Sequence, residues 1–140
     1  MDLVEVPVEA TFGLRRGVLG WEVPSATRIQ GDRAAHLALL HEDAVAAVVS
    51  HATWPCPDEP AVPARYFFGM AVDASYQGRG CGRRLLAAVA ERARAVGESV
   101  MWAEARESAV AFYVACGARA TAPYVEDVAG LAVRRVVFTL

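Results

Sequence analysis

Residues 75–86 read SYQGRGCGRRLL, in which Gly78, Gly80 and Gly82 alternate directly before two arginines and two leucines. Glycine inside a helix or strand costs roughly 0.5–1 kcal/mol relative to alanine, so three in such a short stretch indicate a backbone that needs their freedom. A tight turn is one reason for them. A ligand that must approach the main chain closely is the other, and that reason would tie this stretch to function.

The residues on either side of the glycines predict a strand before them and a helix after them. RYFFGMAV (65–72) is aromatic and apolar with one glycine inside, which predicts a strand with a bulge or kink. In RRLLAAVAERARAV (83–96) the apolar residues recur at helical spacing, and Gly97 follows. This helix is amphipathic and is expected to pack on a sheet through one face, which holds Leu85, Leu86, Val89, Ala90, Ala93 and Val96.

The remaining chain alternates short strands with helices, which predicts an α/β or α+β sandwich. A hairpin is expected at AHLALL (35–40) and VAAVVSHATW (45–54), joined by the tight turn HEDA. The other expected elements are a strand at 3–6, a helix at 8–18, a loop at 20–33, a proline-rich loop at 55–63, a strand at 100–105, a helix at 108–116 ended by Gly117, and a strand at 131–140.

The composition is that of one globular domain. The chain has 140 residues, of which 55% are hydrophobic and 21% charged. Its net charge is −2 with no block of like charge, which argues against a nucleic-acid partner. No apolar run approaches the ~20 residues that span a bilayer, and the acidic start is unlike a signal peptide, so we expect a cytoplasmic protein without a membrane partner. Three widely spaced cysteines predict neither a disulfide framework nor a metal site: Cys56, Cys81 and Cys116.

A strand, a glycine-rich turn and a helix N-terminus together form an arrangement that binds phosphate, because free N–H groups and the helix dipole converge there. Arg79, Arg83 and Arg84 add positive charge. A P-loop is excluded because the chain has no lysine. A dinucleotide-binding fingerprint is excluded because Arg83 stands where its third glycine would be.

The pattern that does fit is Q-x-x-G-x-G, formed by Gln77, Gly80 and Gly82. With it the chain resembles the GNAT superfamily of acetyl-CoA-dependent N-acetyltransferases, and the preceding MAVDASY (70–76) is similar to that family's strand end and turn. Further on, ESAVAFYVACGA (107–118) resembles the family's A-x-x-F-Y-x-x-x-G-F segment. The stretches LRRGVL (14–19), GD (31–32) and YVED (124–127) resemble one bacterial subgroup.

The resemblance implies a single domain over residues 1–140 with a mixed, mostly antiparallel sheet of about six or seven strands, flanked by helices and with splayed central strands. It also implies that the pantetheine arm of acetyl-CoA binds main-chain groups of the strand before the turn, and that the turn binds the pyrophosphate. Carried onto this chain, the cofactor-binding residues are Met70, Ala71, Val72, Gln77, Gly78, Arg79, Gly80, Cys81, Gly82 and Arg83.

The resemblance further implies direct transfer of an acetyl group to a primary amine of a small molecule or peptide in a ternary complex, without a metal. Such a reaction needs an acid for the departing thiolate and a base for the amine. Tyr113 is the expected acid, and a half-buried packing role is the alternative. Glu104 is one candidate base, and Glu126, Asp127, His51 and water are others.

Two positions depart from the family pattern, and several matters stay open. Arg106 replaces a usual asparagine, which puts one helix-cap and cofactor contact in doubt, and Ala118 replaces a packing phenylalanine. Cys81 is expected to pack rather than to act as a nucleophile. The alternative functions are a non-catalytic acyl-CoA-binding or regulatory module and a nucleotide-binding protein, and a homodimer is one assembly open to the chain. Residues that could border a cationic acceptor are Trp21, His51, Trp54, Tyr124, Glu126 and Asp127.

Overall fold

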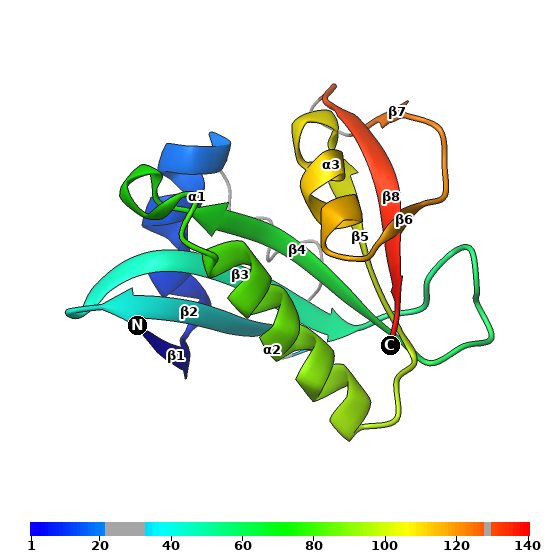
Figure 1. Ribbon diagram of the computed structural model, residues 1–140, viewed down its shortest axis with the longest axis horizontal. Coiled ribbons are helices and arrows are strands. Elements are labelled where there is room, and N and C mark those ends of the chain that lie inside the picture. Colours follow the sequence, from blue (N-terminus) through cyan, green and yellow to red (C-terminus); the bar gives the residue numbers. More distant parts are fainter. Residues whose placement is uncertain (22–32, 128–129) are drawn as a thin grey trace. The chain divides into compact units, whose positions relative to one another are not determined.

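The computed structural model describes residues 1–21, 33–127 and 130–140 and resolves them into two compact units (Figure 1). The first unit comprises residues 1–53 and 67–91, and the second comprises residues 54–66 and 92–140. The chain passes between the units three times: after Thr53, inside strand β4 (Ala64–Val72) and inside helix α2 (Cys81–Ala95). The predicted loop at 20–33 lies mostly outside the described residues.

The first unit is built on the predicted hairpin. Strand β2 (Ala35–His41) pairs antiparallel with β3 (Ala44–Thr53) on one side and with β1 (Asp2–Glu5) on the other. The two turn residues, Glu42 and Asp43, have φ angles of 51° and 68°. A left-handed pair of this kind matches the twist of the strands that it joins, so the HEDA prediction is confirmed.

The helix predicted at 8–18 is present in two parts. A 3₁₀ turn, η1 (Val8–Thr11), leads into the α-helix α1 (Phe12–Leu19), which ends at Gly20 with a φ of 69°. Leu14 and Leu19 of α1 pack on an apolar cluster that contains Ala38 of β2, Val48 of β3 and Ala71 of β4. No helix within the described residues is long and apolar enough to cross a membrane.

The second unit contains the C-terminal strands. Strand β5 (Val100–Arg106) pairs antiparallel along its length with β8 (Ala132–Thr139), and α3 (Glu107–Ala115) follows β5 directly. Two short strands that the sequence analysis did not predict, β6 (Arg119–Ala120) and β7 (Val125–Glu126), also pair with β8. A two-residue strand carries no periodicity, so no pattern could have revealed it.

The hydrogen-bonded strand order is β1-β2-β3-β4-β5-β8-β6, with β7 on β8. Strand β4 pairs parallel with β5 at three positions, Ala64–Tyr66 against Val100–Trp102. The described residues therefore form a mixed, mostly antiparallel sheet of eight strands with helices, as predicted, and the two short strands account for the excess over six or seven.

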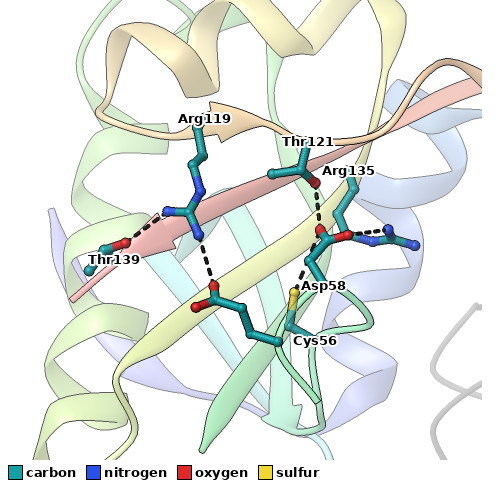
Figure 2. Close-up of polar contacts among 7 residues, drawn as sticks. Cys56, Asp58, Arg119, Thr121, Arg135 and Thr139 are labelled. Carbon is teal, nitrogen blue, oxygen red and sulfur yellow. Dashed lines mark hydrogen bonds and ion pairs between the residues drawn. The ribbon is translucent and has the colours of Figure 1, made fainter. Parts of the chain in front are cut away.

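The proline-rich loop after β3 is held to the C-terminal strands by polar contacts (Figure 2). Asp58 accepts hydrogen bonds from Thr121 Oγ1 at 2.5 Å and from Arg135 Nη1 at 3.1 Å. Glu59 accepts one from Arg119 Nη2 at 2.8 Å. Because the donors lie 60 to 77 residues away in the sequence, these carboxylates fix a loop that has no regular structure of its own.

A buried ion pair joins the start of β4 to the segment after α2. Arg65 Nε lies 2.6 Å from Glu98 Oε1, and the two side chains are 12% and 4% exposed. Each charge has lost most of its hydration, and removing one partner of such a buried pair is strongly destabilising.

We expect Glu98→Gln to lower the free energy of unfolding by about 3–5 kcal/mol, because it removes the carboxylate charge that lies 2.6 Å from Arg65 Nε. The double variant Arg65→Met/Glu98→Gln should recover at least half of that loss, and Glu91→Gln on the exposed face of α2 is the control. Urea unfolding followed by circular dichroism measures all three. Equal destabilisation in the single and double variants would contradict this account of the pair.

Candidate functional site

The turn after β4 is shaped by an aspartate cap. Asp73 Oδ1 accepts a hydrogen bond from Ser75 N at 2.8 Å and thereby caps the 3₁₀ turn η4 (Ala74–Tyr76). The main-chain N–H of Asp73 donates to Ala46 O of β3 at 2.9 Å. The turn therefore leaves β4 in a direction fixed by the neighbouring strand. An aspartate that bonds the N–H two residues on is a common turn signal, and it would have identified Asp73 from the sequence.

Two of the three alternating glycines have the left-handed backbone that justifies their presence. The φ angles of Gly78 and Gly80 are 76° and 81°, whereas Gly82 lies within the first turn of α2. A Cβ atom built on Gly78 or Gly80 would meet nothing within 4 Å. The conformation therefore needs glycine. No described residue fills the space at these two Cβ positions, so a ligand can approach the main chain there.

Helix α2 begins directly at this turn. Its first α-helical hydrogen bond runs from Arg84 N to Gly80 O at 3.0 Å. The N–H groups of the first turn of an α-helix have no partner within the helix, so they are directed toward the glycine turn. The helix carries no acidic residue in its first turn, where a carboxylate would interact favourably with the positive end of the helix dipole. This helix end instead carries Arg83 and Arg84, both exposed.

The side chains around the turn brace it. Gln77 Nε2 donates to Val72 O at 3.3 Å, so this amide is engaged with the strand end. The guanidinium of Arg79 lies 5.5 Å from the ring of Tyr76, whose hydroxyl is 2.8 Å from His41 Nδ1. Cys81 is 4% exposed, with its sulfur 3.8 Å from Tyr76 O, which agrees with the predicted packing role.

Tyr113 lies in the second unit, on α3. Its side chain is 8% exposed, and its ring meets Phe138 and Phe112 edge to face, with centroids 6.5 and 5.3 Å apart. Burial, with a smaller contribution from Cys116, raises the pKa of the phenol to about 12. Tyr113 is therefore neutral at neutral pH and keeps the proton that a donor needs.

The acidic candidates also lie in the second unit. Glu104 is exposed on β5, opposite Arg135 of β8 in the strand register. Glu126 is exposed on β7. Asp127 Oδ1 accepts a hydrogen bond from Leu131 N at 3.0 Å, so this carboxylate holds the turn before β8. Of the three, Glu104 and Glu126 present solvated carboxylates.

The predicted acceptor-site residues are divided between the units. Trp21 and His51 belong to the first unit, where Trp21 lies beside the Arg15 guanidinium and His51 is 2% exposed in β3. Trp54 and Tyr124 belong to the second unit and are 42% and 43% exposed. Among the residues that the structure describes, no group of His, Cys, Asp and Glu could hold a metal ion.

Residues 13–118 match the sequence profile of the acetyltransferase (GNAT) family. The chain belongs to the GNAT family. It is an N-acyltransferase, and enzymes of this family bind an acyl-CoA and an amine acceptor. The comparison with curated proteins returned no match.

Solved structures share the GNAT fold with this chain. An IAA acetyltransferase from Bacillus cereus is 20% identical, with 99% of each chain covered and a TM-score of 0.76. The ribosomal-protein-S18-alanine N-acetyltransferase from Escherichia coli is 20% identical, with 99% of this chain and 92% of that chain covered and a TM-score of 0.73. An aminoglycoside 6'-N-acetyltransferase complexed with coenzyme A is 11% identical, with 99% and 97% covered and a TM-score of 0.77.

Where GNAT enzymes often have an asparagine, Arg106 stands at the N-cap of α3. Within the described part of the chain it makes no side-chain cap hydrogen bond, in agreement with the doubt raised from the sequence. Ala118, which replaces the usual phenylalanine, is 7% exposed and therefore still contributes to the core.

The GNAT pattern gave no indication of a buried polar network in the first unit. Arg15 of α1 is 1% exposed and donates to Thr11 Oγ1 at 2.9 Å and to Ser50 Oγ at 2.5 Å. Ser50 Oγ also lies 2.6 Å from His36 Nδ1, so this hydroxyl connects the guanidinium to the imidazole. The sequence hinted at this network only through Thr11, which lies four residues before Arg15 and therefore on the same face of the predicted helix.

The surroundings of His36 hold it in its neutral form. Burial and the nearby Arg15 cation lower the pKa of His36 below its ordinary value, against a smaller opposing effect from Glu9. The folded protein therefore binds fewer protons at this site than the unfolded chain. The contribution of neutral His36 to the free energy of unfolding is therefore fully present above about pH 6.5. It is lost as the pH falls through the pKa of His36 in the folded state.

We expect acidification from pH 7.5 to 5.5 to lower the melting temperature more in the wild-type protein than in His36→Gln. The glutamine removes the titration while it can still accept a hydrogen bond from Ser50. Differential scanning calorimetry at both pH values measures the effect, and His41→Gln, at an exposed histidine of the same strand, is the control. An identical loss in wild type and His36→Gln would exclude His36 as a source of the acid sensitivity.

Proposed function

We propose that this protein is a single GNAT domain over residues 1–140 that transfers an acetyl group from acetyl-CoA to a primary amine of a small molecule or peptide. The observation that carries the proposal is the left-handed turn at Gly78 and Gly80, which opens onto the start of α2. The proposed transfer is direct, in a ternary complex, and uses no metal. The acyl donor supplies a thioester carbonyl that an uncharged amine can attack.

Electrostatics favours a phosphate at this turn. A cation near a helix N-terminus opposes the dipole, typically by about 0.3–1 kcal/mol for an exposed group. Here the helix end carries Arg83 and Arg84 and has no carboxylate in its first turn. A bound pyrophosphate would turn these repulsions into attractions, and first-turn N–H groups would donate to it. We assign this role to the main chain of Gln77, Gly78, Arg79, Gly80, Cys81 and Gly82 and to the Arg83 side chain.

We assign the pantetheine arm to the main chain of Met70, Ala71 and Val72. These residues form the last part of β4, which leads through η4 into the glycine turn. The described pairing of β4 with β5 involves Ala64–Tyr66 at the other end of the strand. Main-chain groups beyond that pairing are suited to an extended, amide-containing ligand, since such a ligand can bond to a strand as another strand does.

Tyr113 is the proposed proton donor to the departing sulfur. With a pKa of about 12, the phenol is a weaker acid than an ordinary thiol, whose pKa is about 8.5. It therefore acts first as a hydrogen-bond donor that stabilises negative charge on sulfur. Apolar surroundings also raise the pKa of a thiol, which makes completion of the proton transfer more favourable.

Glu104 is the proposed base for the amine, and an exposed carboxylate of this kind can also work through a water molecule. The proposed acceptor is cationic before it loses its proton, because carboxylates and aromatic rings are the exposed groups that suit such a molecule. In the second unit these groups are Glu104, Glu126, Trp54 and Tyr124.

We expect Gly80→Val to abolish binding of acetyl-CoA, because the side chain is strained at a φ of 81° and fills the space in front of the turn. Gly97→Val is a matched control, since Gly97 has the same φ of 81° and also faces open space, but lies beyond the other end of α2. Isothermal titration calorimetry should show loss of affinity in Gly80→Val alone. Wild-type affinity in Gly80→Val would overturn the assignment of the phosphate site.

We expect Tyr113→Phe to lower kcat by about 10²–10⁴-fold, the usual contribution of general acid catalysis. KM for acetyl-CoA should stay within about twofold, because the ring and its packing remain. Thiol release with a panel of amines measures both values, with Tyr66→Phe in the same unit as the control.

A kcat within twofold of wild type would return Tyr113 to a packing role. Acetyl-CoA binding without thiol release by the wild-type protein, with any amine, would favour the non-catalytic acyl-CoA-binding module.

A further inference from the structure

The buried guanidinium of Arg15 is also bonded to the main chain of β4. Arg15 Nε donates to Gly69 O at 2.9 Å, and Nη2 lies 3.5 Å from Phe68 O. With the bonds to Thr11 and Ser50, the guanidinium therefore contacts acceptors from η1, β3 and β4. A side chain of α1 thus fixes two consecutive carbonyl groups immediately before Met70.

The Arg15 guanidinium occupies the space that a side chain at position 69 would need. Gly69 has a φ of 64°, and a Cβ atom at this position would lie 2.6–2.7 Å from the Arg15 guanidinium. Real Cβ contacts are essentially never that short, so either the arginine or the strand would have to move. The glycine gives β4 a local left-handed kink and leaves room for the guanidinium against its main chain.

The bond to Gly69 O also sets the direction of the next N–H group. The chain contains no cis peptide bond among the described residues, and in a planar trans peptide the C=O and the following N–H point in opposite directions. The Met70 N–H is therefore directed away from Arg15. A charged donor on the carbonyl polarises the same peptide and strengthens its N–H as a donor.

Arg15 brings a buried positive charge to this position. Among residues 1–21, 33–127 and 130–140, no carboxylate forms an ion pair with it. Burial lowers the pKa of Arg15 to about 10, so the side chain is still cationic at neutral pH. A buried cation interacts favourably with negative charge that develops nearby, because the interaction takes place in a medium of low dielectric constant.

We propose that Arg15 is a positioning residue that orients and polarises the Gly69–Met70 peptide of β4 toward the acyl group of the donor, where negative charge develops during transfer. The inference rests on the proposed function, because it assumes that the main chain of β4 receives the acyl donor. Arg15 acts through the strand and does not touch the substrate.

Arg15→Gln tests this role, because it removes the charge and most of the donors while it keeps a polar side chain at the site. We expect kcat/KM for acetyl-CoA to fall about 10–100-fold, since a small displacement of a reacting group can cost 10²-fold. The Kd for CoA without an acyl group should stay within about threefold, because the phosphates bind at the glycine turn. Arg15→Lys, which restores the charge but not the planar group, should lie between Arg15→Gln and wild type.

Arg16→Gln is the matched control, since Arg16 is the exposed neighbour on the same helix. If Arg15→Gln does not fold, Ser50→Ala removes one of the acceptors of Arg15 and should lower kcat/KM for acetyl-CoA about three- to tenfold with the Kd for CoA unchanged. Unchanged kcat/KM in Arg15→Gln, or in Ser50→Ala where that is the variant tested, would overturn the inference. A parallel loss of CoA affinity and activity would do so too.

Failure of the proposed function would give a different set of results from failure of the Arg15 inference. In that case the wild-type protein and Arg16→Gln would already lack acetyl-CoA binding or thiol release, and the positioning role would fall with it. A wild-type protein that transfers acetyl groups, together with active Arg15 variants, would contradict the role of Arg15 alone.

Discussion

Strand β4 lies between β3 and β5 in the sheet, and side chains from other segments complete the hydrogen bonding of its main chain. Its first three residues pair with β5, the carbonyls of Phe68 and Gly69 accept from Arg15, and the carbonyl of Val72 accepts from Gln77. The partners of β4 change where the acyl donor is proposed to bind, and the glycine turn continues directly from its end.

Positive charge follows this strand although the chain as a whole has a net charge of −2. Arg15 lies buried against its middle, and arginines surround the helix N-terminus that follows it. The two groups differ in their surroundings. The buried charge acts at short range in a medium of low dielectric constant. The exposed charges are screened by solvent and would attract the proposed phosphate mainly in combination with the helix N–H groups.

The left-handed glycine turn could be predicted because its signal is local. A left-handed turn before an amphipathic helix depends on residues within a few positions of one another, so Gly78 and Gly80 could be read from the sequence, as could the hairpin turn at Glu42 and Asp43. The role of Gly69 could be predicted only in part. Its kink was expected, but the group that occupies the missing Cβ position comes from Arg15, 54 residues earlier.

The sequence by itself determined the family, the mixed sheet with its helices, and the turn that is suited to phosphate, because periodicity, caps and glycine chemistry are encoded over short distances. Only the tertiary structure decided that Arg15 is buried, that Asp58 and Glu59 hold the proline-rich loop, and that burial raises the pKa of Tyr113. Each of these depends on groups from distant segments that meet in space. The burial that shifts a pKa, or leaves a charge without water, is a property of those neighbours and cannot be read from the residue itself.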